Sequence, residues 1–332
     1  MKLLDLKAPK TTVEPRPARQ APPLAEFELP LPAPLAGYGS SALFSLHGRQ
    51  DGPLIAVLGG ISADRFPAFC PDGRPGWWRG LAGPGCAVDP ARHRILGMDF
   101  IADPTGARAP ATHEQAAILC AALDFLGVER AHAVVGASYG GMIALALGQH
   151  FPERVERLTV VSADAQPHPA STAARELQRR IVALGLETGD PDEALSIARG
   201  LAMMTYRTRE EFAERFEGGI PSEQCLDRSE PGAYLRARGA AFVARMTPQR
   251  FLSLSASIDR HKVDPARIRV PALLIGADSD QLVPAAQMEK LAAAFGGPAE
   301  LRLLASLYGH DMFLKDSDRV SALVDPFLRK AA

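Results

Sequence analysis

Short apolar runs alternate with amphipathic stretches along most of the chain. Helical stretches separate several of the runs, notably Glu114–Leu126 and Gln287–Phe295. Continuous apolar runs between helices are typical of parallel strands whose two faces are both covered. The pattern therefore predicts an α/β fold, with a mostly parallel sheet and helices on both of its faces. The expected strands are Leu54–Leu58, Ile95–Asp99, Ala133–Val135, Leu158–Ser162, Ala272–Ile275 and Leu301–Leu304.

The pattern changes between Asp164 and about Arg260, where strand-like runs vanish and helical ones dominate. Ligands of parallel sheets bind at the carboxyl ends of the strands, so a helical insertion there is expected to roof the site. We expect an α/β core at 37–164 and 261–332, a helical cap at 165–260, and an extended Pro-rich segment at 1–36. The expected cap helices are Ala173–Leu184, Pro191–Thr205, Arg209–Glu217 and Tyr234–Met246.

The composition argues against several classes of function. The 332 residues carry a net charge of −1, which gives no electrostatic reason to bind nucleic acid or an anionic membrane. No apolar run approaches the roughly eighteen residues of a membrane-spanning helix. The four cysteines have no Cys-x-x-Cys spacing, so we expect reduced thiols in a cytoplasmic protein and no metal site. These cysteines are Cys70, Cys86, Cys120 and Cys225.

A Gly-x-Ser-x-Gly motif lies between an expected strand and a helix-forming run. The strand-like residues 132–135 run into Gly136-Ala137-Ser138-Tyr139-Gly140, and an apolar helical stretch follows from Met142. A sharp strand-to-helix turn of this kind exposes a serine hydroxyl above the sheet, and glycines avoid collisions with neighbouring backbone. The order predicts that Ser138 is a nucleophile, although the pentapeptide alone also occurs by chance in a glycine-rich chain.

The partners of such a serine follow it in the order acid, then histidine. Two acids, Asp278 and Asp280, follow the strand expected at Ala272–Ile275, and Asp280 is the better candidate because it sits deeper in the turn. His310 is the only histidine beyond them. We therefore predict Ser138, Asp280 and His310 as a catalytic triad, with Asp278 as the alternative acid.

An oxyanion hole needs two backbone N–H groups beside the nucleophile. One is expected from Tyr139, directly after the serine. The other is expected from the glycine-rich loop Gly59–Ser62, with Ile61 as the donor.

Two further features suggest a site for a small amino acid. Asp311 follows His310 directly, so its carboxylate would suit a substrate ammonium, or else it stabilises a helix N-terminus. Arg199 and Tyr206 lie seven residues apart on one face of an expected helix. Pointing into the cleft they would bind a carboxylate, whereas pointing outward Arg199 would form a surface ion pair.

At these residues the chain resembles the homoserine O-acyltransferases of the α/β-hydrolase superfamily. The resemblance runs from about Val57 to Leu314. It rests on Trp77-Trp78 with the following Gly-Pro-Gly, on the serine motif with its Gly-Gly-Met, on residues 199–207, and on Tyr-Gly-His-Asp at 308–311. It implies transfer of an acyl group from acyl-CoA, through a serine acyl-enzyme, to the hydroxyl of L-homoserine in methionine biosynthesis.

The resemblance also implies roles and partners. Asp311 matches the family's residue for the substrate amine, and Arg199 and Tyr206 match residues near its carboxylate and hydroxyl end. No permanently bound cofactor is expected, and family members form homodimers through the cap helices. Acetyl-CoA is the implied donor, and succinyl-CoA is the alternative.

The chain departs from the family pattern around the expected acyl pocket. The departures are Tyr139 after the serine, the loop Gly59–Ser62, and the shorter segment 100–106. They leave the triad intact and the acyl donor open. Alternatives are L-serine as the acceptor, a carboxylesterase-type hydrolase in which water is the acceptor, and a binding module without catalysis.

Overall fold

The computed structural model describes residues 24–216 and 229–330, so most of the Pro-rich segment and Cys225 lie outside the described residues. One eight-stranded sheet runs through the molecule in the order β1-β2-β4-β3-β5-β6-β7-β8. β1 and β2 pair antiparallel at one edge, and β3 to β8 are parallel neighbours. The strands are β1 Leu24–Pro30, β2 Ser41–Gly48, β3 Leu54–Leu58, β4 Arg94–Met98, β5 Ala133–Ala137, β6 Leu158–Val161, β7 Ala272–Ala277 and β8 Ala299–Leu304.

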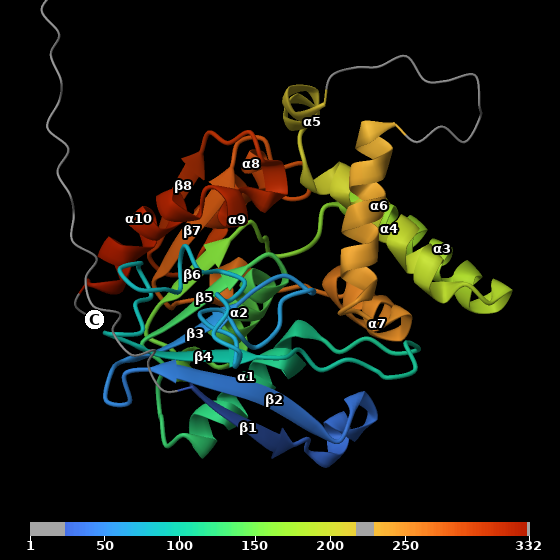
Figure 1. Cartoon of the computed structure of the whole chain (residues 1–332). Helices are drawn as coiled ribbons and strands as arrows, with labels where there is room; N and C mark the ends of the chain where they lie inside the picture. Colours follow the sequence, from blue (N-terminus) through green and yellow to red (C-terminus); the bar gives the residue numbers. More distant parts are fainter. Residues whose placement is uncertain (1–23, 217–228, 331–332) are drawn as a thin grey trace, which may run out of the picture.

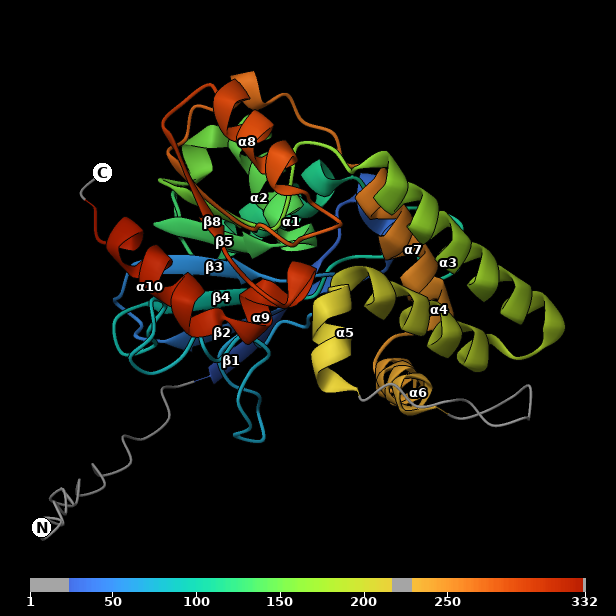
Figure 2. The same cartoon turned by 90° about the horizontal axis from the view of Figure 1, so that it is seen from above.

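Helices cover both faces of the sheet, which confirms the predicted fold class. Figure 2 shows α1, α2 and α8 on one face and α9 and α10 on the other. Burial of both faces explains why the central strands are apolar without alternation. The core helices are α1 Thr112–Phe125, α2 Tyr139–His150, α8 Ala285–Ala294, α9 Met312–Lys315 and α10 Ser317–Leu328.

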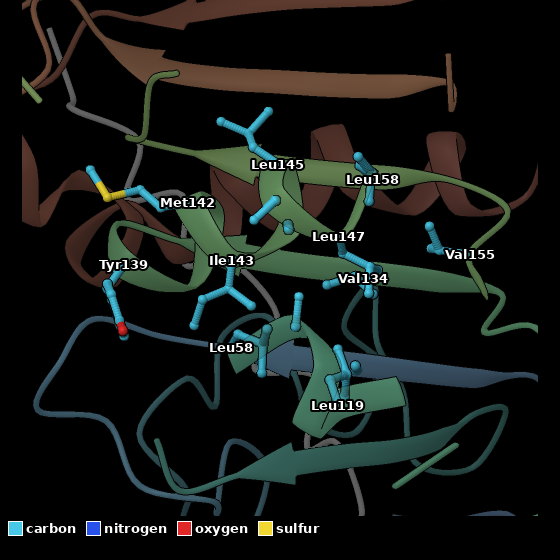
Figure 3. Packing of buried hydrophobic residues seen from close by; sticks show 14 of the residues in the cluster. Leu58, Leu119, Val134, Tyr139, Met142, Ile143, Leu145, Leu147, Val155 and Leu158 are labelled. Carbon is cyan, nitrogen blue, oxygen red and sulfur yellow. The ribbon is translucent and has the colours of Figure 1, made fainter. Parts of the chain in front are cut away.

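Successive residues of the central strand β5 point into two separate apolar layers. Val134 packs in the layer that holds Leu119 and Ile143, on the α1 and α2 face (Figure 3). Val135 packs on the other face, with Val320 of α10. Full burial of such side chains contributes roughly 1.5–3 kcal/mol each. Packing on both faces therefore fixes the position at which β5 ends.

Between β6 and β7 the described residues form five α-helices. They gather beside the sheet rather than on either face, with α3 and α4 reaching farthest from it (Figure 1). Their own small apolar core includes Val182, Leu195 and Phe242. These helices are α3 Pro169–Thr188, α4 Pro191–Tyr206, α5 Arg209–Arg215, α6 Glu230–Val243 and α7 Pro248–Asp259.

The sheet begins earlier than the boundary at residue 37 that we expected from the sequence. Leu24–Pro30 is an edge strand paired with β2, and Phe27 stacks on Phe44 with ring centroids 5.0 Å apart. A Pro-rich extended segment and an edge strand have similar backbone angles, and only the pairing partner distinguishes them. The strand Ser41–Gly48 and the helix Pro248–Asp259 were also not predicted.

No helix in the described parts of the chain is long and apolar enough to cross a membrane.

Candidate active site

Ser138 occupies a strained turn between β5 and α2. Its backbone has φ 53° and ψ −118°, in the positive-φ range that L-residues rarely adopt. Two glycines make the turn feasible by close backbone approach. A Cβ on Gly136 would lie 2.1 Å from the carbonyl oxygen of Gly140, and a Cβ on Gly140 would lie 2.4 Å from that of Leu58. The serine motif is therefore required by packing as well as by chemistry.

His310 joins Ser138 to Asp280. Its Nε2 lies 2.9 Å from Ser138 Oγ, and its Nδ1 lies 2.8 Å from Asp280 Oδ2. Asp280 Oδ1 accepts hydrogen bonds from the backbone N–H groups of Leu282 at 2.8 Å and Val283 at 3.0 Å. Both acid and histidine are buried, so the carboxylate holds the imidazole in a fixed tautomer and orientation.

The alternative acid, Asp278, is turned away from His310. It lies at the exposed end of β7, where its Oδ1 accepts a hydrogen bond from the backbone N–H of Ser306 at 3.2 Å. The structure therefore brings together Ser138, His310 and Asp280, and leaves Asp278 as a residue that joins two loops.

The environment of His310 sets its basicity. Burial by itself would lower the pKa, but the charge and hydrogen bond of Asp280, with a further contribution from Asp311, outweigh burial. The net effect raises the pKa of His310 above its ordinary value of 6.5. An imidazole of raised pKa in contact with a serine hydroxyl is a stronger proton acceptor.

The loop after β3 lies beside Ser138 because of the order of the strands. In the sheet β3 lies between β4 and β5. The loop that follows β3 therefore begins next to the end of β5, which Ser138 follows. Gly59 accepts a hydrogen bond from the backbone N–H of Gly140 at 2.8 Å, and a Cβ on Gly60 would lie 4.0 Å from Ser138 Cβ. The loop therefore lies beside the nucleophile, as an oxyanion hole requires of its second donor, and the choice of the Ile61 and Tyr139 N–H groups as donors stays a prediction.

The Tyr139 side chain does not surround an acyl pocket, contrary to our expectation. It is fully buried against the core (Figure 3), where its hydroxyl lies 2.6 Å from Ser257 Oγ and 3.2 Å from Gln115 Nε2. Its ring packs edge-on against Phe100, with centroids 5.0 Å apart. The side chain of Tyr139 therefore lines neither of the hollows at Ser138.

Two hollows meet at Ser138 and His310. The first, which we call the α3 hollow, is lined by α3 residues including Arg175 and by Gln287. The second, which we call the Trp77 hollow, is lined by residues 60–63, Trp77, Arg199 and Asp311. Tyr206 contributes to both, and its ring centroid lies 5.6 Å from that of His310. The serine is thus accessible from two chemically different sides.

The three residues expected to bind an amino acid are brought together in the Trp77 hollow. Arg199 lies with its guanidinium carbon 5.1 Å from the centre of the Tyr206 ring, and it points into the hollow rather than outward. Asp311, beside His310, is 9 % exposed. A fixed cation and a fixed anion on the walls of one hollow are complementary to the two charges of an amino acid.

Arg207 is a member of this site that we did not predict from the sequence. Its Nε lies 2.8 Å from Asp311 Oδ2, a close ion pair whose angle is outside hydrogen-bond geometry. Its Nη1 lies 3.3 Å from Glu211 Oε1. Arg207 closes the segment 199–207 that carries the resemblance, so its position was visible, but nothing local connects it to Asp311.

Within residues 24–216 and 229–330, no three His, Cys, Asp or Glu side chains are grouped as metal ligands would be.

Comparison with known proteins gives a consistent result. The family described as alpha/beta hydrolase fold matches residues 66–317. The chain is 39% identical over 341 residues to a homoserine O-succinyltransferase from Xanthomonas campestris, covering 99% of the chain and 91% of that protein. It is 34% identical to a homoserine O-acetyltransferase from Thermus thermophilus, covering 77% and 73%. It is 31% identical to a serine O-succinyltransferase from Frateuria aurantia, covering 83% and 88%.

Solved structures share the fold at lower identity. A homoserine O-acetyltransferase from Bacillus anthracis superposes with a TM-score of 0.81 at 18% identity, covering 94% of the chain and 99% of that structure. An esterase superposes with a TM-score of 0.81 at 19% identity, covering 92% and 100%. The fold is thus common to transferases and hydrolases, and the fold alone does not choose between them.

Proposed function

The chain belongs to the homoserine O-acyltransferases of the alpha/beta hydrolase fold family, and from that premise we propose that it transfers an acyl group from acyl-CoA to the hydroxyl of L-homoserine. The acyltransferase activity is common to the relatives at 31% to 39% identity. The donor, the acceptor and a place in methionine biosynthesis are the finer parts of the proposal.

The first half-reaction loads the serine. His310 Nε2 takes the proton of Ser138 Oγ, 2.9 Å away, as the oxygen attacks the thioester carbonyl. Backbone N–H groups of Ile61 and Tyr139 stabilise the tetrahedral oxyanion, and removal of one such donor costs about 3–4 kcal/mol. Collapse breaks the carbon–sulfur bond, and His310 returns its proton to the leaving CoA thiolate. Ser138 then carries the acyl group as an ester.

The second half-reaction uses the same groups in the opposite sense. His310 takes the proton of the homoserine hydroxyl, the hydroxyl oxygen attacks the acyl-enzyme, and Ser138 leaves with the proton returned by His310. We assign the substrate ammonium to Asp311, and the carboxylate and hydroxyl end to Arg199 and Tyr206.

The observation that carries the proposal is the pair of opposite charges, Arg199 and Asp311, on the walls of the Trp77 hollow beside the serine. A hydrolase whose acceptor is water has no use for a buried aspartate and an arginine at the nucleophile, so the hydrolase alternative is less favoured. L-serine stays the alternative acceptor, because it differs from homoserine by one methylene, worth about 1–3 kcal/mol.

Acetyl is the acyl group that the resemblance implies, and succinyl is a second candidate that one observation favours. Arg175 lines the α3 hollow and shares Asp259 with Arg179, at 2.6 Å from each, so two cations face one carboxylate. The acid that lines the hollow, Asp164, is buried, and burial raises its pKa. An acyl chain that ends in a carboxylate would therefore find a cation there.

One experiment separates these functions. Release of free CoA thiol is measured from acetyl-CoA and from succinyl-CoA, each with L-homoserine, with L-serine and with neither amino acid. We expect release that depends on homoserine, with ping-pong kinetics. Release that is independent of any amino acid would instead identify a hydrolase. A chain that releases no thiol from either donor would refute the enzyme assignment.

We also propose that the protein forms a homodimer through its cap helices, and that it works in the cytoplasm, where its donor is found. The support lies on α3 and α4, which present exposed apolar side chains at intervals of seven residues, two helical turns apart on one face. These residues are Leu177 and Leu184 on α3, and Ile197 and Met204 on α4.

A further inference from the structure

A third hollow adjoins the Trp77 hollow, and Ser138 is not among its lining residues. The two share Trp77, Arg199, Arg245, Asp311 and Leu314, so they are neighbours along these side chains. The walls of the third come from α4, α6, the residues after Gly76, and the start of α10. Its empty volume is about 1350 Å³, which includes space open to solvent. None of the triad residues lines this space, and the proposed amino-acid site shares with it only the side chains of Arg199 and Asp311.

The charge of this third hollow, which we call the cationic hollow, is strongly one-sided. Among the described residues of 24–216 and 229–330, its walls carry six cationic side chains and two carboxylates, those of Asp311 and Asp318. Of the six, only Arg207 lies within ion-pair distance of a carboxylate in residues 24–216 and 229–330. The six cationic residues are Arg79, Arg199, Arg207, Arg238, Arg245 and Lys315.

The cations are close enough to repel one another. Desolvation, together with the positive charges of Arg199 and Arg238, lowers the pKa of Arg245. Desolvation and the charges of Arg207 and Arg215 lower the pKa of Lys315. A cluster of like charges held by the fold is unfavourable alone and becomes favourable when an anion enters it. The geometry therefore points to a ligand with more than one negative charge.

Two of these cations lie against aromatic rings. The guanidinium carbon of Arg199 lies 4.8 Å from the centre of the Phe242 ring, and that of Arg238 lies 5.7 Å from the Tyr234 ring. Cation–π contacts orient a guanidinium and leave its edge N–H groups free to donate. Arginine donors in a fixed fork suit the oxygens of phosphates.

We propose that the cationic hollow binds the diphosphate and 3′-phosphate of CoA. In this arrangement the uncharged pantetheine arm crosses the Trp77 hollow and delivers the thioester to Ser138. The proposal rests on acyl-CoA being the donor, and it adds where the donor's charges are recognised. It also gives a reason for a ping-pong order, because homoserine binds where the pantetheine arm had lain, and CoA has to leave first.

The test compares two donors that share the acyl-pantetheine arm and differ in the nucleotide with its phosphates. The double variant Arg238→Gln with Arg245→Gln is assayed with acyl-CoA and with the matching S-acyl-pantetheine, which lacks the nucleotide and its phosphates. We expect the KM for acyl-CoA to rise about tenfold or more, since two charge-assisted contacts are lost, while the KM for S-acyl-pantetheine stays the same. The wild-type KM for acyl-CoA should also rise with salt.

The matched control is Arg236→Gln, an exposed arginine on α6 that does not line the hollow. It should leave both KM values unchanged. Equal losses with both donors, or no change with acyl-CoA, would overturn the proposal. Binding of free CoA is measured by calorimetry in parallel, so that a wild-type protein inactive with every donor still tests the hollow. In that case the acyltransferase function fails, whereas the hollow is supported only if the double variant binds CoA more weakly.

Discussion

At the scale of single residues, the site depends on which of two acids holds His310. Asp280 lies 2.8 Å from His310 Nδ1, and Asp278 instead bonds the backbone of Ser306. The two acids are two positions apart, so the turn after β7 points one inward and the other to the surface. This difference allows a matched pair of variants.

Asp280→Asn should lower kcat by about four orders of magnitude, because an amide favours the wrong tautomer of the imidazole. Asp278→Asn should leave kcat close to that of the wild type. Both are measured by thiol release at saturating donor and acceptor, with circular dichroism to verify folding. If Asp278→Asn were the damaging change, the roles given to the two acids would be reversed.

The rate should also depend on pH through His310. The pKa of this residue is raised above 6.5, and the base must be neutral to accept the Ser138 proton. Activity is therefore expected at higher pH and is lost as the pH falls through the raised pKa. The measurement is kcat/KM for acyl-CoA against pH, which reports the free enzyme. An acid limb with its midpoint below 6.5 would contradict this environment for His310.

At the scale of elements, the position of the nucleophile turn is fixed by the buried contacts of the residue that follows Ser138. α2 begins at Tyr139, whose side chain fills a space between α1 and α7 and whose hydroxyl bonds Gln115 and Ser257. The tyrosine thus anchors the first turn of α2 to the two helices on either side. This role is structural, whereas the sequence had suggested a role in acyl selectivity.

Tyr139→Phe tests this difference. Loss of the hydroxyl removes one hydrogen bond each from Gln115 and Ser257, which keep their bonds to backbone carbonyls, so the free energy of unfolding should fall by about 1–3 kcal/mol. The ratio of kcat/KM for acetyl-CoA to that for succinyl-CoA should not change, because the ring lines neither hollow at Ser138. Urea denaturation and the two-donor assay measure the two effects. A changed donor ratio with unchanged stability would indicate that Tyr139 affects the choice of acyl group after all.

At the scale of the whole molecule, the α3–α4 pair is the part that reaches farthest from the sheet, and it carries exposed apolar residues (Figure 2). Ile197 is 52% exposed on α4. Covering such a face with a second copy would remove apolar surface from water.

Ile197→Glu should convert the proposed dimer to a monomer, since it places a charge in the apolar contact. The mass is measured by light scattering after size-exclusion chromatography. Ile197→Leu, which keeps the apolar surface, is the control and should stay dimeric. A wild-type mass of one chain would refute the dimer, and an Ile197→Glu dimer would exclude this face as its interface.

The sequence by itself determined the class of fold and the order of the reactive residues. Apolar runs and helical spacing are local, so the parallel strands, most of the cap helices and the serine turn could be read from it. The edge strand Leu24–Pro30 could not, because pairing rather than local preference makes it a strand.

Only the tertiary structure decided which side chains meet. Ser138 and His310 are 172 positions apart, and Arg207 and Asp311 are brought together from the residue after α4 and the turn before α9. The direction of Tyr139 and the gathering of Arg238 and Lys315 around one hollow likewise follow from how elements pack. Contacts between distant segments depend on strand order and helix packing, and neither is encoded in the local spacing of residues.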